Sequence, residues 1–265
     1  MRIVSYLNAG SPSWGFVVGD SVVDRTSVPG VTAATVRELI EAGALPDEAA
    51  VAGGAVVFLP AGRYLVAGRL VVKEGVTLRG DWCPPSEGRT PETTILMLTA
   101  GRGEADGPAT ITTERGSGLR ELTIWYPEQN PASIVPYPWT IRTSESATGD
   151  NTTIYNATLV NPYQAVRIGP EWNELHTLRN VYATALRCGV SIDTTTDIGR
   201  LIDVDFGPEW WETSGLFGAP TTDEARQALR SALLSDAVAI DMEWSERTLH
   251  PALTVHALHF VFLCL

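Results

Sequence analysis

The chain has 265 residues, of which 44% are hydrophobic, and a formal net charge of −12 at pH 7. This is enough apolar sequence for one large β domain or two domains, but the acidic balance argues against nucleic acid and anionic membranes as partners, because both require a basic face. No run of 18 apolar residues occurs and the N-terminus lacks a signal-peptide pattern, so no transmembrane helix is predicted and the chain as written is expected in the cytoplasm.

The cysteine content also agrees with a location in the cytoplasm. Cys83, Cys188 and Cys264 form no metal-binding spacing, and an odd number leaves a thiol over in any pairing scheme. A disulfide framework is therefore not expected, which suits a reducing compartment. No metal and no cofactor are predicted.

The first 24 residues alternate between apolar and polar side chains, as short strands do. Further on, Thr32 is placed to cap a helix that runs to about Ala42. The wording MRIVSYLNAGSPSWGFVVGDSVVD and TVRELIEAGAL resembles the N-terminal domain of the fumarylacetoacetate hydrolase family. The resemblance covers residues 1–50 and implies a small α+β domain without chemistry of its own. That family's metal-binding acidic residues lie in a larger C-terminal domain, whose motif does not follow here.

Beyond residue 50 the pattern changes to short apolar strands with Gly or Pro at the bends, as in AGGAVVFLPAGRYLVAGRLVVKEGVTLRG over residues 52–80. One apolar pattern then recurs. It consists of three apolar residues, with two other residues between the first and the second and one other residue between the second and the third. Its members are Leu119, Leu122, Ile124; Ile154, Ala157, Leu159; Leu178, Val181, Ala183; and Leu201, Val204, Phe206. The starts are 35, 24 and 23 residues apart.

A second series of strands interleaves with the first and is centred on Ile111, Ile141, Ile168 and Ile192. Two strand series that advance together at this period predict a solenoid of stacked β-coils, because one coil cannot bury its inner face alone. Within this region the segment at 219–236 predicts a helical insertion, for which Thr222 or Asp223 can serve as the N-cap. The fold class predicted for the whole chain is therefore mainly β.

The phrase VVFLPAGRYLV leading to VTLRG, and the strands through DVDFGPEWW, resemble the pectate-lyase-like β-helix family of the rhamnogalacturonase or epimerase-like type, which is related to glycoside hydrolase family 28. The resemblance covers residues 52–245. It implies a single-stranded right-handed parallel β-helix, here assigned to residues 51–265, and a polysaccharide or oligosaccharide partner. The apolar tail RTLHPALTVHALHFVFLCL departs from the family, so a truncated chain is expected; the alternative is that the tail folds over the last coil as its cap. An open coil end would also allow oligomers to form through it.

Asp203 and Asp205 are the predicted catalytic residues. They alternate with Val204 and Phe206, which places both on the outer face of one strand about 6.5–7 Å apart, in the range of an inverting acid and base pair. The alternative is that paired acids on a solvated strand serve solubility and edge protection. The characteristic residue set of glycoside hydrolase family 28 is not found, so its mechanism is not carried over.

Several other polar residues are of types that take part in catalysis or ion binding, but each also has a structural explanation. Glu171, Glu174 and His176 fall in one bend and would satisfy that turn or pack on the next coil. Asp193 and Asp197 bracket a Thr-rich turn that explains them better than a calcium ion does. No role is assigned to His250, His256 and His259, because their spacing matches no metal-binding motif.

Aromatic residues at strand ends and in bends predict a surface on which sugar rings stack. The predicted substrate-binding residues are Trp125, Tyr126, Trp139, Trp172, Trp210 and Trp211. The alternative is that such residues pack loops onto the coils. The insertion at 127–138 lengthens one coil and is expected to form the wall of a groove.

Three functions remain open. The first is a carbohydrate-active enzyme, either a glycoside hydrolase or a polysaccharide lyase. The second is a noncatalytic β-helix that binds glycan or serves as a structural module. The third is a protein of the fumarylacetoacetate hydrolase family that lacks its catalytic domain.

Overall fold

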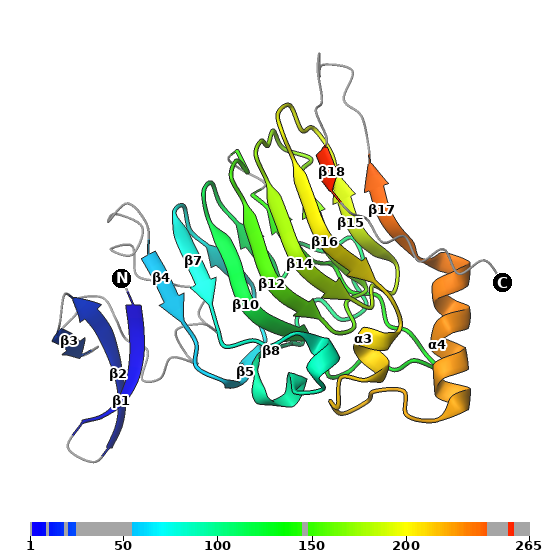
Figure 1. Ribbon diagram of the computed structural model, residues 1–265, viewed down its shortest axis with the longest axis horizontal. Coiled ribbons are helices and arrows are strands. Elements are labelled where there is room, and N and C mark those ends of the chain that lie inside the picture. The colour runs from blue at the N-terminus through cyan, green and yellow to red at the C-terminus, as the bar shows by residue number, and fades with distance from the viewer. Residues whose placement is uncertain are drawn as a thin grey trace.

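The computed structural model describes residues 2–8, 11–18, 21–24, 55–144, 148–242 and 254–256. Over these residues the protein is mainly β, as predicted, and its strands form one antiparallel and two parallel sheets (Figure 1). No helix in the described ranges is long and apolar enough to cross a membrane.

The antiparallel sheet lies at the start of the chain. It consists of β1 (Arg2–Asn8), β2 (Ser11–Val18) and β3 (Ser21–Asp24). The strands predicted for the first 24 residues are thus confirmed. The helix predicted from Thr32 to Ala42 lies outside the described residues.

The two parallel sheets take up most of the remaining chain. The nine-stranded sheet contains β4 (Ala55–Phe58), β5 (Gly62–Val66), β7 (Val76–Arg79), β8 (Thr94–Leu98), β10 (Gly118–Trp125), β12 (Thr153–Leu159), β14 (Thr177–Ala183), β16 (Arg200–Phe206) and β18 (Thr254–His256). The six-stranded sheet contains β6 (Leu70–Val72), β9 (Ile111–Thr113), β11 (Trp139–Thr143), β13 (Gln164–Ile168), β15 (Cys188–Ile192) and β17 (Val238–Met242). From β9 onwards successive strands alternate between the two sheets, so each pass of the chain adds one strand to both.

The pairing register confirms the first apolar repeat. The first apolar position of the pattern pairs across β10, β12, β14 and β16, through Leu119, Ile154, Leu178 and Leu201. The other two apolar positions pair in the same way. The second series is confirmed as a set of strands but with a shifted register, because Ile141 pairs with Val166. Side chains from both sheets make up the main core, which therefore lies between them.

A column of residues in the left-handed conformation explains the apolar pattern. It shows why two residues separate the first two apolar positions, whereas one residue would separate them in a regular strand. Glu121, Asn156, Asn180 and Asp203 have φ between 51° and 58° and occupy the third position of the repeat. The extra residue bends each strand and returns the next apolar side chain to the core. Asn180 Nδ2 also donates to Asn156 Oδ1 at 2.8 Å. Asparagine tolerates this conformation better than most residues do.

Substitution of Asn180 tests this explanation. Asn180→Ala is expected to lower the free energy of unfolding by about 1–3 kcal/mol, because it combines left-handed strain with the lost hydrogen bond. Asn180→Gly loses the same hydrogen bond but has no Cβ, so it is expected to be the more stable of the two. Urea unfolding of both variants measures the difference. An alanine variant as stable as the glycine variant would contradict the explanation.

Two helices cover the ends of the strands near β16. They are α3 (Glu209–Glu212) and α4 (Asp223–Asp236). The predicted helical insertion is confirmed by α4, where Thr222 Oγ1 accepts from the amide of Ala225 at 3.2 Å. The short α3 was not predicted. Apolar side chains of the two helices pack with side chains from the strands and loops in a second apolar cluster. Its members are Ile95, Trp125, Val160, Leu186, Trp211, Leu216 and Leu229.

Candidate active site

A row of polar side chains crosses the outer face of the nine-stranded sheet, near the C-terminal ends of its strands. Thr158, Tyr182 and Asp205 occupy the same register position on β12, β14 and β16. The strand neighbours of Tyr182, Val181 and Ala183, belong to the main core. Because side chains alternate along a strand, the row lies on the face turned away from the core.

Two tryptophans flank Tyr182 on this face. Trp82, in the segment after β7, donates from Nε1 to Thr158 Oγ1 at 2.8 Å. Its indole stacks on the Tyr182 ring with centroids 6.2 Å apart and 21° between the planes. Trp210 of α3 meets the same ring edge-on at 5.0 Å. All three rings are half-buried, and partly exposed aromatic rings beside polar groups are frequent components of ligand sites.

Three carboxylates gather around the aromatic rings. Burial raises the pKa of Tyr182, and the negative charges of Asp203 and Asp205 raise it further. Burial also raises the pKa of Glu209, in the first turn of α3, and the charge of Asp205 adds to this shift. Each carboxylate is thus within electrostatic reach of another member of the group. We call Trp82, Tyr182, Asp203, Asp205, Glu209 and Trp210 the aromatic–acidic site.

The position of Glu209 depends on a glycine. A Cβ added at Gly207 would lie 2.2 Å from Glu209 Oε2, so the carboxylate lies directly against the backbone that follows β16. The same closeness to the protein accounts for the burial that raises its pKa. A carboxylic acid that stays protonated to higher pH can donate a proton to a bound substrate.

Hydrogen bonds fix α3 from two sides. The Thr184 hydroxyl, which is buried, donates to the Gly207 carbonyl at 2.7 Å and accepts from the Trp211 amide at 2.9 Å. Glu212 accepts from Nε and Nη2 of Arg230 on α4 at 3.0 and 2.9 Å. These contacts set the position from which Glu209 and Trp210 reach the sheet.

Replacing Thr184 tests this anchoring. Thr184→Val keeps the shape of the side chain but removes the hydroxyl that donates to the Gly207 carbonyl and accepts from the Trp211 amide, so it is expected to lower the free energy of unfolding by about 1–3 kcal/mol. The Trp211 amide keeps its longer hydrogen bond to the Pro208 carbonyl, at 3.2 Å. Thr184→Ser retains the hydroxyl and should lose clearly less. Denaturant unfolding followed by tryptophan fluorescence measures both. A valine variant as stable as the parent, with the loss confined to the serine variant, would show that packing of the methyl group, rather than the hydrogen bonds, holds α3.

The structure modifies the expected geometry of the predicted catalytic pair. Asp203 lies in the left-handed column with φ of 51°, so β16 bends at this residue and the spacing of an extended strand does not apply. Asp203 is exposed and Asp205 is half-buried. Both charges act on Tyr182, so the structure brings both residues into the aromatic–acidic site.

Of the predicted substrate-binding aromatics, only Trp210 belongs to this site. Trp125, Tyr126 and Trp211 are 3%, 0% and 0% exposed, because they pack in the two apolar clusters and do not reach a surface ligand. Trp139 begins β11 on the other parallel sheet, with the Arg167 guanidinium 5.9 Å from its ring centroid.

Trp172 is 48% exposed but lies in the bend before β14, at the opposite end of the strand from Tyr182. Its Nε1 donates to Glu174 Oε1 at 3.2 Å, and the same oxygen accepts from Thr196 Oγ1 at 2.6 Å. Glu174 thus links the bend before β14 to the turn before β16. His176 is fully buried and packs on Gly199, just before β16.

The remaining predicted groups stay in their turns. Asp193 accepts from the Thr194 hydroxyl, and Asp197 accepts from the amide of Ile198. His250 and His259 lie outside the described residues. Among those that the structure describes, no group of three or more His, Cys, Asp or Glu residues is placed to hold a metal ion.

Sequence reasoning missed Trp82, Tyr182 and Glu209. Tyr182 follows the same alternation as Asp205, so the register of the repeat could have placed the two side by side. Glu209 and Trp82 lie outside the regular strands, and no repeat position points to them. Their contribution depends on how the segments after β7 and β16 fold back over the sheet.

Comparison with family models, curated proteins and solved structures finds no significant match to this chain. The fold and the site by themselves define a mainly β protein with two parallel sheets and an aromatic–acidic site on the outer face of one of them. The resemblance of residues 1–50 to the N-terminal domain of the fumarylacetoacetate hydrolase family stays a prediction.

Proposed function

We propose that the chain is a right-handed parallel β-helix of the pectate-lyase-like kind, and that its aromatic–acidic site hydrolyses glycosidic bonds of a polysaccharide. The strict alternation of strands between two parallel sheets from β9 to β18 supports the fold. The family resemblance stated for residues 52–245 supports the carbohydrate substrate.

One observation carries the proposed chemistry. Glu209 has a raised pKa and lies within electrostatic reach of Asp205, beside a ring system formed by Trp82, Tyr182 and Trp210. Glycosidases use two carboxyl groups: a protonated one gives its proton to the leaving-group oxygen, and an ionised one activates water or attacks the sugar. Glu209 suits the first role, and Asp205 or Asp203 suits the second.

A hydrolase is favoured over a lyase by the same observation. A raised pKa serves a general acid, whereas a lyase begins with a base that removes a proton. A noncatalytic glycan-binding module is the second candidate, because the three aromatic rings alone provide a stacking surface. Hydrolysis and binding therefore need to be measured together.

The test is a panel of neutral and acidic polysaccharides incubated with the protein. Release of reducing ends without absorbance of an unsaturated uronate supports hydrolysis, and unsaturated products would indicate a lyase. Binding without products, lowered by Trp82→Ala, would favour the noncatalytic module. Neither binding nor products would contradict the carbohydrate assignment.

A further inference from the structure

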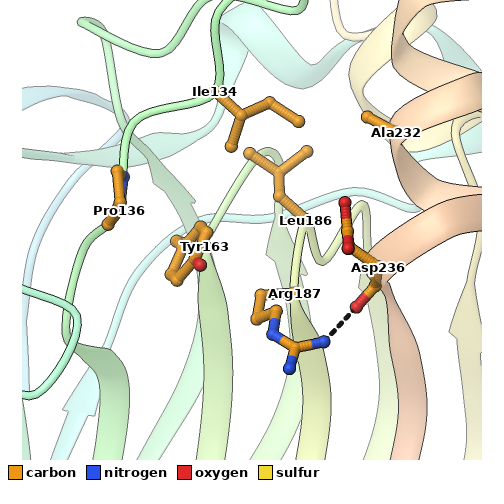
Figure 2. A pocket seen from close by; sticks show the side chains of 7 residues that line it. All are labelled: Ile134, Pro136, Tyr163, Leu186, Arg187, Ala232 and Asp236. Carbon is orange, nitrogen blue, oxygen red and sulfur yellow. Dashed lines mark hydrogen bonds between the residues drawn. The ribbon is translucent and has the colours of Figure 1, made fainter.

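A second candidate binding site lies apart from the aromatic–acidic site. It is a pocket of about 380 Å³ between the insertion at 127–138, the turn before β15 and the end of α4 (Figure 2). This volume is typical of small-molecule sites, which span about 300–1,000 Å³. The lining residues are Ile134, Pro136, Tyr163, Leu186, Arg187, Ala232 and Asp236. The insertion thus contributes to the wall of a pocket, and no lining residue belongs to the aromatic–acidic site.

The walls of the pocket differ in polarity. Ile134, Leu186 and Ala232 present apolar surface on one side (Figure 2). Arg187 and Asp236 bring one charge of each sign, and within the described part of the chain neither forms a salt bridge. The two charges cancel, so the pocket as a whole favours no net charge on its ligand.

Hydrogen bonds between its walls shape this pocket before any ligand binds. Arg187 donates from Nη1 to the backbone carbonyl of Asp236, and its backbone amide donates to the Tyr163 carbonyl at 2.8 Å. The Asp236 carboxylate accepts from the Ser235 hydroxyl at 2.7 Å. The remaining guanidinium N–H groups of Arg187 are donors for a ligand, and the Asp236 carboxylate has further lone pairs.

We propose that this pocket binds a single neutral saccharide unit. A sugar ring offers hydroxyl hydrogens to Asp236, hydroxyl oxygens to Arg187, and an apolar C–H face to Ile134 and Leu186. The Asp236 carboxylate would oppose the attraction of an anionic ligand to Arg187, and the Arg187 guanidinium would oppose the attraction of a cationic ligand to Asp236. The choice of a saccharide over another neutral polyol rests on the proposed function, whereas the preference for a neutral ligand follows from the lining alone.

Direct binding tests the pocket independently of catalysis. The probes are the monosaccharides glucose and galactose, measured by saturation-transfer NMR, for which Kd values of about 1 mM, near −4 kcal/mol, are expected. Ala232→Trp fills the pocket and should weaken binding at least tenfold. Ser231→Trp places the same side chain at the neighbouring exposed position of α4 and should bind as the parent does. Equal melting temperatures of the two variants exclude misfolding.

A Trp82→Ala, Trp210→Ala double variant separates the two sites. It should keep monosaccharide binding and lose polysaccharide hydrolysis, so failure of the proposed function leaves the pocket result standing. Parental binding by Ala232→Trp, or no binding of any probe, would overturn the proposal. Tighter binding of glucuronate than of glucose would overturn the preference for a neutral ligand.

Discussion

Glu209→Gln is expected to lower the release of reducing ends by about 10²- to 10⁴-fold, the usual contribution of a general acid. The substitution keeps the size of the side chain and its position against Gly207 but removes the proton that would be donated. Substrate binding should change little, because the three aromatic rings remain. The measurement is kcat and KM on the polysaccharide that the parent degrades. Glu171→Gln, at an exposed acid in the bend before β14, serves as the control and should retain full activity.

The pH profile gives this prediction a second readout. A general acid works only while protonated, so activity should fall as the pH rises through the pKa of Glu209. Glu212 raises that pKa and Arg230 lowers it. Glu212→Gln removes the first charge and leaves the second, so the alkaline limb should move to lower pH. An unchanged limb, or a Glu209→Gln variant with parental kcat, would assign the acid role to another residue.

Much of the architecture could be predicted from sequence because each strand of the repeat pairs in parallel with the equivalent strand of the next repeat. Leu119, Ile154 and Leu178 recur at this spacing, and they are successive partners whose side chains lie in the main core. The shifted pairing of Ile141 with Val166 shows the limit of this reasoning. Where the repeats differ in loop length, apolar periodicity finds the strands but not their register.

The site was harder to predict because it depends on segments that have no period. Trp125 and Trp211 lie near strand ends in the sequence, as a stacking surface would, yet both pack with Leu229 of α4 in the second apolar cluster. Trp210, the neighbour of Trp211 in α3, instead contacts the Tyr182 ring edge-on. A helix of one turn separates such neighbours, and no repeat or spacing in the sequence predicts where it lies.

The stability of the protein is expected to fall steeply in acid because of His176. Its side chain is fully buried, and neither ring nitrogen has a hydrogen-bond partner among the described residues. Burial lowers the pKa of His176 from 6.5 to about 4. The unfolded chain therefore binds the proton more readily than the folded one. The contribution is fully present above pH 6.5 and is lost as the pH falls toward 4, by about 3 kcal/mol in all.

Replacing the imidazole separates this effect from the titration of carboxylates. His176→Leu has a side chain of similar size that cannot be protonated, so urea unfolding between pH 7.5 and about pH 4.5 should show a shallower loss of stability than in the parent. Gly199→Ala is the matched packing variant, since its Cβ would lie 2.2 Å from His176 Nε2. We expect it to be destabilised at every pH in this range, because the imidazole must shift to accommodate the methyl group. A leucine variant that loses stability as steeply as the parent would show that His176 is not protonated on unfolding, and that other groups set the acid limit.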